Sequence, residues 1–204
     1  MILSLLLLDL GSPSVRQCFQ NCQDLHRNIM KAFDAPRSEA KVLYRVIRSE
    51  RNIQIYVQSS AKPQWDRIEP NGFKCVKEKD ISQLPDSFRT DQVLHFSLFA
   101  CPSKKVAGDG KNSKRVILRG EENQIEWLKR QGEKTGFSLL EAHVSGKAET
   151  MRGKKPSGEF QISGIPFEGV LQIKDVDSFR KGFAEGIGAE KAYGFGMLMV
   201  NKVK

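Results

Sequence analysis

Cysteine and histidine are scarce in this chain, and neither residue type is spaced as metal ligands usually are. The 204 residues include four cysteines and three histidines, with no C-x-x-C pair among them. Zinc sites commonly draw their ligands from such closely spaced pairs. The sequence therefore predicts no metal site and no cofactor, and reduced thiols in a cytosol are the simplest interpretation of the cysteines. The cysteines are Cys18, Cys22, Cys75 and Cys101.

Long hydrophobic runs are also absent. The opening MILSLLLLDL is apolar, but no basic region precedes it and Asp9 ends the run. A secretory signal begins with basic residues, and a bilayer span needs about 20 apolar residues. We therefore expect neither a signal peptide nor a membrane partner, but a cytoplasmic protein whose residues 2–8 form a buried strand.

Two signatures of nucleotide binding are missing, whereas positive charge is abundant. The sequence contains no Walker-type phosphate loop and no aromatic RNP motif, which argues against base stacking in the manner of an RRM sheet. Lysine and arginine together number 33 against 24 acidic residues, so the formal net charge is +9. Such an excess suits a polyanionic partner, because cations that neutralise phosphates release condensed counterions.

The basic residues concentrate in two runs. Residues 101–119 hold six cations and one acid, a net charge of +5, and residues 145–158 hold four cations and one acid, a net charge of +3. The second run falls between two predicted strands, which indicates a basic hairpin arm able to enter an RNA groove. A solvated linker and a solvated loop are the alternative interpretation. The candidate RNA-binding residues of these runs are Lys104, Lys105, Arg115, Arg152, Lys154 and Lys155.

Hydrophobic periodicity predicts two successive rounds of strands and helices. The first round comprises strands at 2–8, 41–47, 53–59 and 92–101, a helix at 21–33, and an irregular stretch at 62–85 with at most a weak second helix. The second comprises helices at 121–131 and 175–185 and strands at 137–144, 162–173 and 197–203. Each round follows the order of a ferredoxin-like domain. We therefore predict an α+β fold of two tandem ferredoxin-like (RRM-like) domains, at 1–103 and 115–204, joined by a linker at 104–114.

The predicted helix at 21–33 carries a histidine at the edge of its apolar stripe. The stripe consists of Cys22, Leu25, Ile29, Ala32 and Phe33. His26 borders it, and Arg27 and Lys31 lie farther from the core on the same flank. An imidazole titrates near neutral pH, and cations beside it can hold a phosphate, so this arrangement suits phosphoryl chemistry. A histidine that is merely packed at the margin of a core is the alternative.

A glycine-dense segment, GIGAEKAYGFG at residues 186–196, precedes the last predicted strand. Glycine permits a backbone to approach a phosphate closely. Gly186, Gly188 and Gly194 are therefore candidate RNA-binding positions. Lys191 between them can contact a phosphate or remain solvated, and its spacing favours neither.

Several segments together resemble one known family, the CasE endoribonucleases of type I-E CRISPR systems. The resemblance is most specific where FEGVLQIKDVD (167–177) is followed by the glycine-dense segment and Met197-Leu198. It continues through IEWLK (125–129), FACPSKK (99–105) and DLHRNIMK (24–31), and so covers essentially the whole chain.

The resemblance implies both a fold and an activity. CasE proteins have two tandem ferredoxin-like domains and cut a CRISPR repeat RNA hairpin without metal. A 2′-hydroxyl attacks the adjacent phosphate and leaves a 2′,3′-cyclic phosphate and a 5′-hydroxyl. The product stays bound, and the protein joins the other subunits of the Cascade complex. By this resemblance His26 is the general acid or base, Arg27 and Lys31 lie near the scissile phosphate, and Lys191 with its flanking glycines approaches the RNA.

One position departs from the family, and two other functions stay open. The family has a tyrosine three residues before the histidine, where this chain has Gln23. An amide can donate a hydrogen bond but cannot transfer a proton as an acid, so the enzyme is slower or uses another group, for which Tyr193 is a candidate. The alternatives are a non-catalytic RNA-hairpin-binding subunit of the same complex and a basic ferredoxin-like scaffold without an RNA partner.

Overall fold

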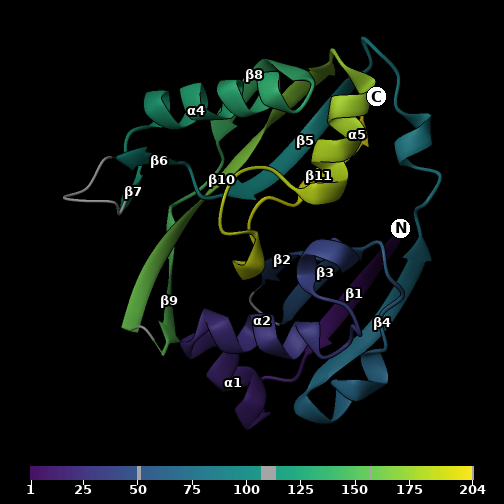
Figure 1. Cartoon of the computed structure of the whole chain (residues 1–204), viewed down its shortest axis with the longest axis vertical. Helices are drawn as coiled ribbons and strands as arrows, with labels where there is room; N and C mark the ends of the chain where they lie inside the picture. The colour runs from purple at the N-terminus through teal and green to yellow at the C-terminus, as the bar shows by residue number, and fades with distance from the viewer. Residues whose placement is uncertain (50–51, 107–113, 157, 204) are drawn as a thin grey trace.

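A four-stranded antiparallel sheet forms the N-terminal half of the protein (Figure 1). The computed structural model describes residues 1–49, 52–106, 114–156 and 158–203. The strand order in this sheet is β2-β3-β1-β4. Its strands are β1 (Ile2–Leu8), β2 (Leu43–Arg48), β3 (Ile53–Ser59) and β4 (Phe73–Asp80). Its helices are α1 (Pro13–Gln20), α2 (Cys22–Met30) and α3 (Arg37–Ala40), followed after β3 by the 3₁₀ turns η1 (Trp65–Arg67) and η2 (Glu69–Asn71).

The C-terminal half contains a second antiparallel sheet, with the strand order β11-β5-β10-β8. Its strands are β5 (Val93–Ala100), β8 (Phe137–Val144), β9 (Glu149–Lys155), β10 (Gly158–Ile173) and β11 (Leu198–Lys202). Its helices are α4 (Glu121–Lys134) and α5 (Val176–Glu185), with the 3₁₀ turns η3 (Pro85–Ser87) and η4 (Lys191–Tyr193). Each strand order contains four strands, because β9 pairs with β10 and lies off the second one. In both orders the first and third strands along the chain occupy the centre, and the second and fourth occupy the edges. The prediction of two tandem ferredoxin-like domains is therefore confirmed.

Local sequence explains the elements that carry the site. Asn21 is the N-cap of α2, and its side-chain Oδ1 accepts a hydrogen bond from the backbone N–H of Gln23 at 3.1 Å. Such a cap satisfies one of the free N–H groups at a helix start. The predicted apolar stripe of this helix is buried, from Cys22 at 6% exposed to Ile29 at 0%. The orientation of α2 is therefore fixed, and Ala32 and Phe33 just after it are also buried.

Helix α1 was not expected from the sequence, because its residues are mostly polar. Only Val15 and Cys18 of this eight-residue helix are buried. The informative signal is Ser12-Pro13, since proline is favoured at the first position of a helix, where its missing N–H costs nothing. α1 packs beside α2 and places Gln17 and Gln20 next to the start of that helix.

Strand β5 lies in the second sheet, which corrects its assignment to a domain at 1–103. It pairs antiparallel with β10 and β11. The fourth strand of the first sheet is β4, paired with β1. The sequence pattern does not reveal β4, because it is a charged edge strand in which Phe73 alone is fully buried. We propose that the boundary between the domains falls between β4 and β5.

The predicted linker at 104–114 is in part a short antiparallel hairpin. β6 (Ser103–Val106) pairs with β7 (Lys114–Ile117), with Lys104 opposite Val116. Residues 107–113 of that linker lie outside the described residues. The β6–β7 hairpin therefore belongs to the C-terminal half, where it follows β5 in the chain. None of the described helices is long and apolar enough to cross a bilayer.

Candidate active site

The basic run at 145–158 forms a hairpin arm, as predicted. β9 pairs antiparallel with the first half of β10, from Glu149 opposite Gly164 to Lys155 opposite Gly158. The arm extends from the second sheet to the N-terminal end of α2 (Figure 1). There the backbone N–H of Lys154 donates to Asn21 Oδ1 at 3.1 Å. The N-cap residue of α2 thus also fixes the position of the arm.

The base of the arm is tied to the first sheet by an ion pair. Arg48 on β2 contacts Glu149 on β9 at 2.6 Å and also lies over the ring of Phe19, 5.2 Å from its centroid. Near this point Arg45 donates to Ser97 on β5 at 2.7 Å. Contacts at both ends of the arm therefore join the two halves of the protein.

The glycine-dense segment is a loop that lies between the two sheets (Figure 1). The buried hydroxyl of Tyr44 on β2 donates to the Ala192 carbonyl at 2.8 Å. Gly194 has φ +88, and a Cβ at this position would lie 3.0 Å from the Tyr44 ring. Glycine is required there both for the left-handed backbone and for the close approach to β2. The loop is consequently held against the N-terminal half.

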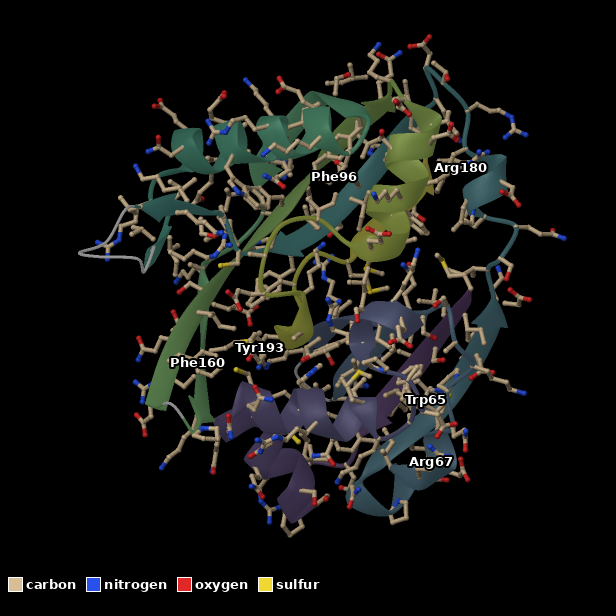
Figure 2. All side chains as sticks on the ribbon, viewed as in Figure 1. Trp65, Arg67, Phe96, Phe160, Arg180 and Tyr193 are labelled. Carbon is tan, nitrogen blue, oxygen red and sulfur yellow. The ribbon has the colours of Figure 1, made fainter. Side chains whose placement is uncertain are left out.

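His26 lies where α2, this loop and the arm meet. Its side chain is half-buried, and its ring makes an edge-on contact with the Tyr193 ring at a centroid distance of 6.3 Å. The Tyr193 hydroxyl donates to Gln23 Oε1 at 2.9 Å. On the arm, the Phe160 ring lies 5.3 Å from the Tyr193 ring. Figure 2 shows Tyr193 on the loop and Phe160 on the neighbouring arm.

The two cations predicted beside His26 are exposed on α2. Arg27 forms an ion pair with Asp24 at 3.3 Å, and its side chain remains 57% exposed. The Lys31 ammonium donates to Asn28 Oδ1 at 3.2 Å. Both side chains are accessible to a phosphate, and their predicted role at the scissile bond stays a prediction.

Lys191, in the glycine-dense loop, is half-buried near another cation. Partial burial lowers the pKa of its ammonium below the ordinary value, Arg37 lowers it further by charge repulsion, and Glu185 opposes both effects. A bound phosphate would offset this repulsion. That Lys191 contacts RNA stays a prediction.

A groove of about 770 Å³ separates the arm from helices α1 and α2. Polar and charged side chains line it, with Phe160 as the aromatic member. Arg152 and Lys154 are exposed along its arm side. Its lining residues are Gln17, Gln20, Asn21, Asp24, Arg152, Gly153, Lys154, Glu159, Phe160 and Gln161.

The remaining predicted RNA-binding residues do not join the cluster around His26. Lys104, Lys105 and Arg115 are exposed on the β6–β7 hairpin, which projects on the same side of the molecule as the arm (Figure 1). Arg115 donates to Ser103 Oγ at 3.0 Å. The side chain of Lys155 lies outside the described part of the structure.

Gly186 and Gly188 are in close contact with other parts of the protein. A Cβ on Gly186 would lie 2.7 Å from Leu43, and one on Gly188 would lie 2.9 Å from the Trp127 ring. Packing of the loop is thus sufficient to explain both glycines. That they also approach RNA stays a prediction.

Two residues of the site were not expected from the sequence: Phe160 and Tyr44. The signal for Phe160 is an aromatic residue that follows a basic run within a strand. Tyr44 has no local signal, because its hydroxyl bonds to Ala192, 148 residues farther along the chain. Within the described residues, no three His, Cys, Asp or Glu side chains come together as metal ligands would.

Comparison with known proteins gives the family. A family model described as CRISPR associated protein matches residues 1–202. The chain belongs to this family. Among CRISPR associated proteins, the CRISPR-associated endoribonuclease Cse3 of Thermus thermophilus is 27% identical over 216 residues, covering 98% of this chain and 99% of the relative.

Solved structures of the same kind share the fold. Thermus thermophilus Cse3 bound to an RNA representing a pre-cleavage complex has a TM-score of 0.86 at 26% identity, covering 98% of each chain. The CRISPR-associated protein Cas6e from Escherichia coli K-12 has a TM-score of 0.75 at 22% identity, covering 100% of each chain. The similarity thus extends over both ferredoxin-like domains.

Proposed function

We propose that this chain is an endoribonuclease that cuts CRISPR repeat RNA at a stem-loop, with His26 as its general acid or base. The observation that carries the proposal is the position of His26, where α2, the glycine-dense loop and the basic arm meet. The relative named as an endoribonuclease matches the chain over nearly its full length, which supports the activity.

The proposed reaction is an internal transesterification. The ribose 2′-oxygen forms a bond to the adjacent phosphorus, and the bond from phosphorus to the 5′-oxygen breaks. A base removes the 2′-hydroxyl proton, and an acid protonates the leaving 5′-oxygen. The imidazole of His26 can fill either role, since histidine titrates near the operating pH. Arg27 and Lys31 stabilise the negative charge that develops on the phosphate oxygens.

Cleavage is expected to persist without divalent metal. The reaction needs two proton transfers, one at His26 and the other with solvent water, and charge stabilisation by Arg27 and Lys31, so none of its steps requires a metal ion. A labelled repeat hairpin incubated with the protein in excess EDTA should be cut at one site, leaving a 2′,3′-cyclic phosphate. Binding without any cut, with or without Mg²⁺, would instead identify a non-catalytic hairpin-binding subunit. Absence of binding would leave only a scaffold role.

The arm is expected to recognise the stem of the hairpin. Replacing both Arg152 and Lys154 by alanine should weaken hairpin binding by about 100-fold or more, because each charge-assisted bond to a phosphate contributes about 1.5 kcal/mol or more. Binding of an unpaired RNA of the same composition should change much less, since stem readers follow duplex shape. Cleavage at saturating protein should survive.

A variant with the same change in charge provides the control. Lys77 and Lys79 are exposed on the edge strand β4, away from the arm (Figure 1). Alanine at both positions should leave hairpin affinity within about twofold of the wild type. Equal losses on hairpin and unpaired RNA in the arm variant would make the arm a general charge patch.

The proposal extends to retention of the product and to location. The cut RNA stays bound, and the protein joins the other Cascade subunits, as the resemblance to CasE proteins implies. None of the four cysteines forms a disulfide. Reduced thiols suit the reducing cytoplasm, where precursor RNA is made.

A further inference from the structure

Tyr193 is held in one position by contacts from three elements. Its side chain is 5% exposed. The Phe160 ring of the arm lies at 5.3 Å, tilted by 45°, and the His26 ring lies at 6.3 Å, tilted by 68°. The Tyr44 hydroxyl fixes the preceding carbonyl, that of Ala192. A buried ring restrained on several sides has little rotational freedom.

The hydroxyl of Tyr193 is directed at α2. It donates to Gln23 Oε1 at 2.9 Å, across 170 residues of sequence. Gln23 and His26 are three residues apart, so they lie on the same face of the helix. Tyr193 therefore contacts one turn of α2 at two points, through its hydroxyl at Gln23 and through its ring at His26. The ring separation is within the range of favourable aromatic pairs.

We propose that Tyr193 is a positioning residue that fixes the imidazole of His26, with its hydroxyl anchored on Gln23. The Tyr193 proton is engaged by the Gln23 carbonyl, so the phenol orients the histidine and does not itself transfer a proton to the RNA. The arm contributes through Phe160, whose ring packs against the Tyr193 ring. This inference rests on the proposed role of His26.

The test compares variants that remove only the anchoring bond. Tyr193→Phe keeps the ring and loses the hydroxyl, and Gln23→Met keeps the length of the side chain and loses the acceptor. Each should slow single-turnover cleavage at saturating protein about three- to tenfold, the effect of one lost hydrogen bond on the barrier. The concentration for half-saturation with RNA should not change. The pH profile of the rate should shift in both variants, because the surroundings of the imidazole change.

The double variant decides between positioning and unrelated effects. Since either single change breaks the same bond, Tyr193→Phe with Gln23→Met should be no slower than the slower single variant. Tyr56→Phe, a half-buried tyrosine on β3, is the matched control and should retain the wild-type rate.

Three results would overturn the inference: an unchanged rate in Tyr193→Phe, multiplicative losses in the double variant, or a loss confined to RNA affinity. These results are distinct from failure of the proposed function, in which the wild-type protein itself leaves the hairpin uncut. A melting temperature measured for each variant separates loss of fold from loss of positioning. If Tyr193→Phe unfolds, Gln23→Met still tests the same hydrogen bond, because Gln23 is only half-buried.

Discussion

Replacing His26 by alanine is expected to slow hairpin cleavage by about 10²- to 10⁴-fold while leaving RNA affinity nearly unchanged. General acid–base groups contribute this much to proton-transfer reactions. The side chain is half-buried and packs on Tyr193, so its loss removes an imidazole from the site without removing an exposed cation. Single-turnover rates at saturating protein, together with equilibrium binding, measure the two quantities separately.

A second histidine serves as the control for this substitution. His95 is exposed on β5 and takes no part in the cluster at α2. His95→Ala should cut at the wild-type rate. A loss of less than tenfold in His26→Ala would remove His26 from the mechanism and direct the search to another general acid or base.

Binding of the hairpin is expected to weaken roughly a thousandfold between 50 and 200 mM salt. A protein that makes about 6 phosphate contacts releases a corresponding number of counterions, and the logarithm of its affinity falls linearly with the logarithm of the salt concentration. The exposed cations available for such contacts lie on the arm, the β6–β7 hairpin and α2. They are Arg27, Lys31, Lys104, Lys105, Arg115, Arg152 and Lys154.

The slope of that salt dependence can be assigned to individual cations. Removing Arg152 and Lys154 together should reduce it by about 2, because each cation that neutralises a phosphate accounts for about one unit. A flat response in the wild-type protein would mean that the basic runs are solvated surface. An unchanged slope in the arm variant would place the phosphate contacts on the other cations.

The sequence predicts best those elements whose hydrophobic pattern is local. The strands at 2–8, 53–59 and 137–144 agree with β1, β3 and β8, because each of these strands carries several apolar side chains that pack in or against the core. The strand β4 and the helix α1 consist mostly of charged or polar residues, so their few core-facing side chains produce no clear pattern. Because β4 gives no pattern, the sequence assigns the strand predicted at 92–101 as the fourth strand of the first domain. The hydrogen-bond partners of this strand, β5, follow it in the chain and belong to the second sheet.

The candidate site was predictable only in part, for a related reason. The helical wheel places His26, Arg27 and Lys31 on one flank of α2, because residues of one helix have a fixed spacing. The contacts of Tyr193 with Gln23 and Phe160 join three elements through tertiary packing. No periodicity encodes contacts over such separations, so Phe160 and Tyr44 emerge only from the structure.

Strand β10 is 16 residues long, and its first part forms the arm while its second part belongs to the second sheet. Among the described strands, residues 158–164 pair with β9 alone, whereas residues 165–173 pair with β5 and β8 in the sheet. Adding or deleting one residue on each side of the arm's tip would change its reach without altering the register inside the sheet, because that register is set beyond residue 164. We therefore expect arms of different length and charge to be interchangeable on one catalytic body, so that a single fold can serve repeats with stems of different length.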